Sequence, residues 1–226
     1  MDVFVIPIGA ERYELYCETA VEAPKPETSS SGIIGRLRYR FAVMLHQAED
    51  RRRGGQTYPR ATTQLGRLQE WIMAWVAERV AEQRLLWNLR REREVVAFHP
   101  QDLTFEQTLT LIHRVLQRDY ERHRVWLVVD TLLLIGSIAL ILLPGPNIIG
   151  YYFAFRVMGH WLSIRGAQQG LWTVTWTGQP CEPLTKLREV ALLHGDARSQ
   201  GVHDIEQQLR LHHLSTFFER VAVRSA

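Results

Sequence analysis

The sequence predicts a mainly α-helical, membrane-associated fold, in which a helical hairpin of two apolar helices joins a soluble helical module and a small antiparallel β-sheet. Two observations lead to the helical part: apolar residues recur at helical spacing through the first half of the chain, and a long apolar run follows from Val125. A third observation leads to the sheet, because short β-favouring segments lie near the N-terminus and after Gly170.

The expected organisation follows changes of composition along the chain. Val3–Ile8 and Tyr13–Thr19 favour strands, and the alternating segment "LWTVTWT" after Gly170 is expected to pair with them. Amphipathic helices are expected to begin near Ile33, and one of them should end near Glu94. The five regions are β-strands at 1–20, a Pro/Ser-rich linker at 21–32, a soluble helical module at 33–124, a membrane hairpin at 125–164, and a strand with closing helices at 165–226.

A long helix is expected to carry the first arm of the hairpin. Thr104 and Gln107 fit a capping box, which predicts that this helix begins just after Thr104. The 19 residues Val125–Leu143 contain one charged side chain, Asp130. At about 1.5 Å per residue they would span roughly 28 Å, close to the ~30 Å of a bilayer core. The sequence therefore predicts a membrane segment here, and a buried helix of a soluble protein is the alternative.

A tight turn should follow the first arm. Proline and glycine favour such a turn, and an asparagine after them is a good N-cap for the next helix. The turn residues are Pro144, Gly145, Pro146 and Asn147. Residues 147–164 are then long enough for a return arm.

Three polar residues are expected to meet between the two arms. If Gly145 is the tip, Asp130 and His160 lie 15 residues away on opposite sides and reach the same depth. Arg156 lies four residues before His160 and shares its helical face. A charge inside a membrane costs at least about 2.5 kcal/mol unless it is paired. Two interpretations stay open: an ion pair that only sets the register of the arms, or a proton site in which Asp130 and His160 exchange protons and Arg156 sets the local field.

The region from Arg124 to Gly170 also resembles a known family. The resemblance lies in an apolar segment followed by Pro146-Asn147-Ile148, Phe155-Arg156, His160-Trp161 and Gly166. These motifs resemble those of the mitochondrial K+-H+ exchange-related proteins. The resemblance implies a link to potassium–proton exchange, as an accessory factor or as the exchanger itself. An acidic residue at position 130 is not part of that pattern, so chemistry that depends on Asp130 would be particular to this chain.

Other function classes have little support in the sequence. Cys17 and Cys181 lie far apart without metal-ligand spacing, so neither a metal site nor a cofactor is expected. Residues 1–124 hold 19 Arg/Lys against 17 Asp/Glu, a near balance that argues against nucleic-acid binding. No nucleophile motif or phosphate-binding loop is present in the sequence, so an enzyme is not expected.

The sequence therefore leads to three functional hypotheses. The first is a membrane-anchored accessory or regulatory protein of potassium–proton homeostasis. Its partners would be lipid and other membrane proteins or further copies of the chain. It would lie in a bacterial cytoplasmic membrane or the mitochondrial inner membrane, with both termini on the cytoplasmic or matrix side, where arginine clusters in the chain should hold them. The second is an oligomeric potassium/proton exchanger, and the third is a soluble, non-enzymatic helical scaffold with a buried hairpin.

Overall fold

The computed structural model describes residues 1–9, 12–18, 85–138, 148–193 and 195–223. The chain divides into two compact units, one formed by Met1–Thr19 with Leu85–Ala226 and the other by Ala20–Arg84. All the described helices and strands belong to the first unit. The expected linker at 21–32, the first part of the helical module and the expected turn Pro144–Asn147 lie outside the described residues.

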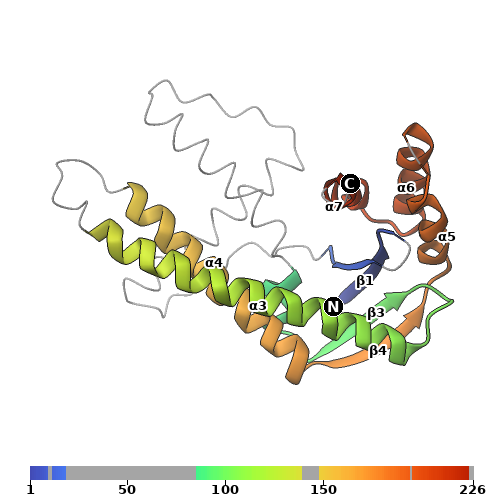
Figure 1. The fold of residues 1–226 in the computed structure, drawn as a ribbon. Coiled ribbons are helices and arrows are strands. Elements are labelled where there is room, and N and C mark those ends of the chain that lie inside the picture. Colours follow the sequence, from blue (N-terminus) through green and yellow to red (C-terminus); the bar gives the residue numbers. More distant parts are fainter. Residues whose placement is uncertain (10–11, 19–84, 139–147, 194, 224–226) are drawn as a thin grey trace, which may run out of the picture. The chain divides into compact units, whose positions relative to one another are not determined.

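A four-stranded mixed sheet lies at the centre of the first unit (Figure 1). Its strands are β1 (Asp2–Pro7), β2 (Tyr13–Tyr16), β3 (Glu94–His99) and β4 (Thr175–Pro180), in the order β2-β1-β3-β4. β1 pairs antiparallel with β2 and parallel with β3, and β3 pairs parallel with β4. The prediction of an antiparallel sheet is wrong, because β3 was not expected and separates β4 from the N-terminal strands.

The β3 segment forms a strand because its residues favour one. "EVVAFH" contains two β-branched valines, and its side chains alternate between full and partial burial. β1 is buried on both sides of the sheet, since successive side chains of a strand point to opposite faces. Val3 and Val5 belong to one core, whereas Phe4 and Ile6 belong to another.

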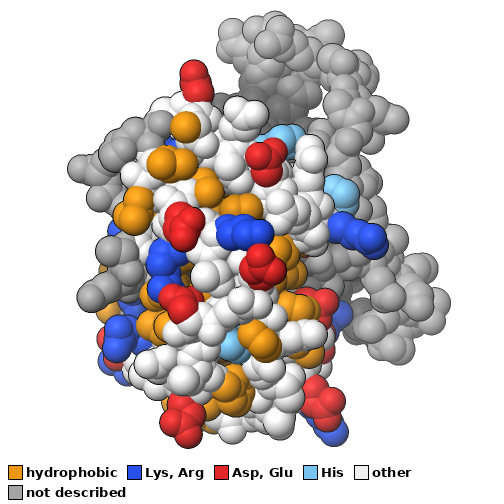
Figure 2. All heavy atoms as spheres, turned by 90° about the vertical axis from the view of Figure 1, so that its right-hand side faces the viewer, with side chains coloured by type: hydrophobic (Ala, Val, Ile, Leu, Met, Phe, Trp, Pro, Cys, Tyr) orange, Lys and Arg blue, Asp and Glu red, His pale blue; other side chains and the backbone are white. Residues whose placement is uncertain are grey.

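Helices cover both faces of the sheet (Figure 1). The first core lies against α3 (Phe105–Ile138), α4 (Ile148–Trp172) and the helical residues 85–89. The second core lies against three C-terminal helices: α5 (Glu182–Ala191), α6 (Asp196–Gln208) and α7 (Leu214–Val223). The face of the molecule that is turned towards the viewer in Figure 2 mingles hydrophobic side chains with charges of both signs among its described residues.

Local hydrogen bonds begin two of the helices. The backbone N–H of Thr104 donates to Gln107 Oε1 (2.9 Å) and the N–H of Gln107 donates to Thr104 Oγ1 (3.2 Å), which confirms the capping box before α3. Before α7, the backbone N–H groups of His212 and His213 donate to the carboxylate of Glu18. This long-range contact, from a carboxylate two residues beyond β2, satisfies backbone N–H groups just before α7.

The expected pair of membrane-spanning helices is not found among the residues that the structure describes. Within the described residues, no helix has the length and apolar character needed to cross a membrane. The described part of the apolar run ends at Ile138, and it contains Asp130. α4 carries Arg156, His160 and Arg165, which lower its apolar character along most of its length. The prediction of an apolar membrane hairpin is therefore wrong, although α3 and α4 do pack side by side (Figure 1).

Candidate functional site

A polar cluster lies between α3 and α4, and it contains the three residues that the sequence placed there. Nε of Arg156 lies 2.9 Å from Oδ2 of Asp130, and Nε2 of His160 lies 3.0 Å from the same oxygen. Asp130 is only 1% exposed. A carboxylate buried to this extent needs an opposite charge close by, because an unpaired buried charge is strongly destabilising. Arg156 provides that charge, and His160 provides a second donor.

His123 on α3 extends the cluster. Its Nδ1 lies 2.8 Å from Nδ1 of His160, and the two ring centroids are 5.1 Å apart. His123 and Asp130 are seven residues apart, about two helical turns, so both face α4. That spacing is the sequence signal for His123. His123 was not predicted to join the cluster, because it precedes the apolar run and falls in the expected soluble module.

The hydrogen bonds determine the tautomers of the two neutral histidines. A carboxylate can only accept, so His160 donates its Nε2–H to Asp130 and keeps a lone pair on Nδ1. His123 therefore donates its Nδ1–H to His160, and its own lone pair lies on Nε2. We call Asp130, His160 and His123 the histidine chain. It is a continuous series of hydrogen bonds that ends in a free acceptor position on the His123 ring.

Burial keeps both histidines neutral. Desolvation, followed by the charges of His160 and Arg122, lowers the pKa of His123 to about 4. Desolvation also lowers the pKa of His160, and the nearby charge of Arg156 acts in the same direction while Asp130 opposes it. Near pH 7 the buried carboxylate is therefore balanced by Arg156, and neither histidine is charged.

Aromatic rings surround the guanidinium of Arg156. Its Cζ lies 5.5 Å from the centroid of the Trp126 ring and 5.7 Å from that of the Tyr152 ring. Its Nη1 also donates to the Tyr152 hydroxyl at 3.2 Å. Burial disfavours the charge of Arg156, but the hydrogen bonds to Tyr152 and Asp130 outweigh it and raise the pKa of the guanidinium. Arg156 is thus a permanent cation in the cluster.

One oxygen of the buried carboxylate has no donor. Oδ1 of Asp130 is buried and accepts no hydrogen bond within the described part of the chain. A buried acceptor without a donor costs about 1–3 kcal/mol, and a charged one costs more. The hydrogen bonds of the described residues therefore do not fully satisfy this buried carboxylate.

Three further residues of the motifs noted in the sequence, Phe155, Trp161 and Gly166, lie on α4. They play different structural roles. Phe155 is partly buried, and Trp161 is 45% exposed with the guanidinium of Arg165 5.5 Å from its ring. Gly166 lies where α4 meets the helical residues 85–89, and a Cβ there would be 1.6 Å from the carbonyl oxygen of Leu86. Gly166 therefore sets the distance between two helices.

Neither cysteine belongs to the cluster. Cys17 is buried in the first core, and Cys181 packs against the second. Among the described residues, no three His, Cys, Asp or Glu side chains are grouped in a way that could hold a metal ion.

Comparison with known protein families agrees with the motifs of α4. Residues 2–171 match the model of the family described as mitochondrial K+-H+ exchange-related, which is three quarters of the chain. The chain belongs to this family. The resemblance noted in the sequence is thus confirmed. The matched residues of this family member include β1, β2, β3, α3, α4 up to Leu171, and the whole histidine chain. No curated protein and no solved structure matches the chain.

Proposed function

We propose that this family member is an accessory or regulatory protein of potassium–proton exchange, and that the histidine chain is the place where it takes up a proton. The observation that carries this proposal is the position of His160, which is hydrogen-bonded through one ring nitrogen to Asp130 and through the other to His123. An imidazole held at both nitrogens can accept a proton on one side and release it on the other.

The proton transfer follows from the tautomers. A proton that binds Nε2 of His123 makes that ring an imidazolium. His123 then passes its Nδ1–H proton to Nδ1 of His160, which leaves His123 neutral and makes His160 the imidazolium. The new cation lies 3.0 Å from Oδ2 of Asp130, and the bond to Asp130 stabilises it there. One positive charge has then moved from the His123 end of the histidine chain to His160, next to the buried carboxylate.

Arg156 limits how far this transfer is favourable. It already compensates the charge of Asp130, so a protonated His160 adds a second cation to the same carboxylate. The protonated state is therefore stable only when the proton concentration is high or when the α3–α4 pair rearranges. Such a group suits a sensor of pH, because its charge state changes the balance of forces between two packed helices.

The outer face of α3 supports a role in contact with a partner. Four apolar side chains at helical spacing are exposed there, and we call them the α3 stripe: Val125 (61% exposed), Val128 (58%), Leu132 (64%) and Ile135 (58%). Exposed apolar surfaces of this kind mark contact sites for other proteins or for a membrane. We propose that the α3 stripe binds another protein of the exchange machinery or a second copy of this chain, so that proton uptake by the histidine chain reaches the partner through α3.

The test uses potassium-driven proton flux in membrane vesicles from cells that lack the chain. Adding the full chain should restore the flux and the dependence of the flux on pH. Adding the His160→Gln or the His123→Gln variant should not restore the dependence of the flux on pH. His113→Gln is the matched control, because His113 lies on the same helix and contacts none of these residues in the described structure. Flux that responds to pH in the same way with all three variants would overturn the histidine chain as the site.

A second arm tests whether the chain acts as an accessory. The purified chain in liposomes should move neither potassium nor protons by itself, whereas an exchanger would do so. Replacing Val128 and Leu132 by glutamine should leave the fold intact, since both are exposed, and should abolish restoration of flux in vesicles. Exchange by the purified chain alone would instead establish it as the exchanger.

A further inference from the structure

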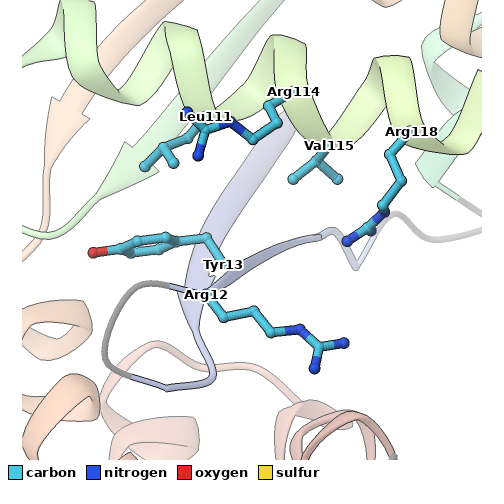
Figure 3. Close-up of a pocket in the computed structure, with 6 residues that line it drawn as sticks. All are labelled: Arg12, Tyr13, Leu111, Arg114, Val115 and Arg118. Atoms are coloured by element: carbon cyan, nitrogen blue, oxygen red, sulfur yellow. The ribbon is translucent and has the colours of Figure 1, made fainter. Parts of the chain in front are cut away.

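A second candidate site lies near the beginning of α3. Arg114 precedes Asp130 by 16 residues, about 24 Å along the helix, so this site is separate from the histidine chain. A hollow of about 130 Å³ lies here between α3 and the start of β2 (Figure 3). Its lining residues are Arg12, Tyr13, Leu111, Arg114, Val115 and Arg118.

The charged lining of the hollow consists of three arginines. Arg118 makes a two-pronged ion pair with Glu14 at 3.0 and 2.7 Å, and its Nη2 also lies 3.4 Å from Asp119. Nη2 of Arg12 lies 4.0 Å from Glu14. By contrast, Arg114 is exposed and has neither a hydrogen bond nor an ion pair with the described residues. Arg12 and Arg118 thus both lie close to the Glu14 carboxylate, whereas Arg114 has no partner among the described residues.

The remaining lining of the hollow is apolar. The ring of Tyr13 is 9% exposed and lies below α3, while Leu111, half-buried, and Val115, buried, come from the helix above it (Figure 3). Leu111, Arg114, Val115 and Arg118 share one face of α3 because they are spaced three or four residues apart. The same face thus presents a free guanidinium next to an apolar floor.

We propose that this hollow binds a small organic monocarboxylate with a short apolar tail. A guanidinium holds a carboxylate through two parallel N–H···O bonds, and Arg114 is free to do so. A single negative charge also matches the one unpaired guanidinium of Arg114. A phosphate group would carry up to two charges and three acceptor oxygens, which one free arginine does not satisfy. The apolar tail would cover Tyr13, Leu111 and Val115.

The probes for this site are acetate and butyrate, titrated into the full chain at constant ionic strength and followed by the NMR signals of the Tyr13 ring and the Arg114 side chain. Both should saturate. Butyrate should bind about tenfold more tightly than acetate, because it buries two further methylene groups. Arg114→Gln should remove saturable binding by both probes, and Arg114→Lys should weaken it by losing the two-pronged geometry.

Arg124→Gln is the matched control, since Arg124 is an exposed arginine on the same helix that does not line the hollow. It should bind butyrate as the unchanged chain does. The proposal is overturned if the signals do not saturate, if Arg114→Gln binds as well as the unchanged chain, or if butyrate binds no more tightly than acetate. Circular dichroism would verify that Arg114→Gln keeps the fold.

A carboxylate could be a free acid or the side chain of a glutamate in a partner protein, and a third probe separates these sources. A glutamate blocked at both backbone ends carries the same carboxylate and methylene groups together with two amides. Tighter binding of this probe than of butyrate would assign the hollow to an acidic side chain of a partner. Weaker binding would assign it to a free acid. This site does not depend on the histidine chain, so failure here leaves the proposed proton uptake untouched.

Discussion

At the scale of single residues, the carboxylate of Asp130 governs the cluster. It is buried, it accepts from both Arg156 and His160, and one of its oxygens is without a donor. The low polarity around it makes each of these bonds strong and makes the loss of any partner costly. The substitution that tests this most directly keeps the size of the side chain and removes its charge.

Asp130→Asn should lower the free energy of unfolding by about 3 kcal/mol, because it leaves the Arg156 cation without its counter-charge. Denaturant titration would measure the change. Glu182→Gln is the control: it breaks the exposed Glu182–Lys186 pair, and little change is expected. A loss for Asp130→Asn no larger than that of the control would mean that the ion pair contributes nothing.

The histidines predict how stability depends on pH. The pKa of His123 is about 4 in the folded chain and 6.5 when the residue is free in solution, so the unfolded chain binds more protons between these values. The free energy of unfolding should therefore have its full value above about pH 6.5, and it should decrease as the pH drops towards 4. The lowered pKa of His160 acts in the same direction.

His123→Gln should remove part of this dependence. Between pH 7 and pH 4.5 the free energy of unfolding of the variant should fall by about 2 kcal/mol less than that of the unchanged chain. Thermal unfolding at a series of pH values would measure it. His212→Gln is the comparison, because the side chain of His212 is exposed, and its pH profile should follow that of the unchanged chain. Identical profiles for the two variants would contradict the burial of His123 as the cause.

At the scale of elements, glycine determines how closely α4 approaches its neighbour. A Cβ on Gly166 would overlap the carbonyl of Leu86, and backbone atoms cannot turn aside as a side chain can. A Cβ on Gly136 of α3 would meet nothing within 4 Å. These two helical glycines thus offer opposite surroundings for the same substitution.

Gly166→Ala should destabilise the chain by about 2–3 kcal/mol, because α4 must shift away from the helical residues 85–89. Gly136→Ala should stabilise it by roughly 0.5–1 kcal/mol, because alanine favours the helix and no contact is disturbed. Chemical denaturation of both variants would compare them. Equal effects would show that the close approach at Gly166 is not a constraint.

At the scale of the whole molecule, the first unit is completed by residues beyond the family match. The match ends at residue 171, whereas β4, α5, α6 and α7 lie after it. These helices cover the face of the sheet that carries Phe4, Ile6 and Tyr16. The cluster between α3 and α4 therefore lies inside the matched residues. The helices that cover the other face of the sheet lie outside them.

A chain that ends at Leu171 should expose the second face of the sheet and fail to fold cooperatively, because β3 loses its pairing with β4 and Phe4 and Ile6 lose their cover. Binding of a hydrophobic dye and loss of a sharp thermal transition would report this. A chain that ends at Val223 keeps α7 and should unfold as the full chain does. Cooperative unfolding of the shorter chain would mean that the first core suffices.

The sequence by itself determined the features that depend on local spacing. These are the capping box at Thr104, the shared helical face of Arg156 and His160, and the motifs of the family. Even the meeting of Asp130 with these two residues was predicted, because Asp130 and His160 are each 15 residues from Gly145. Such features need only the helical repeat and neighbouring hydrogen bonds.

Only the tertiary structure decided the rest. The neighbours of a strand depend on contacts between segments that are far apart in the sequence. The letters "EVVAFH" therefore could not predict that β3 lies between β1 and β4. The hydrogen bond from His123 to His160 depends on the register of two packed helices. The run from Val125 resembled a membrane segment because hydropathy counts apolar residues without regard to the buried face that Asp130 occupies. Charge, burial and partner are properties of the assembled helices, and these give the histidine chain its chemistry.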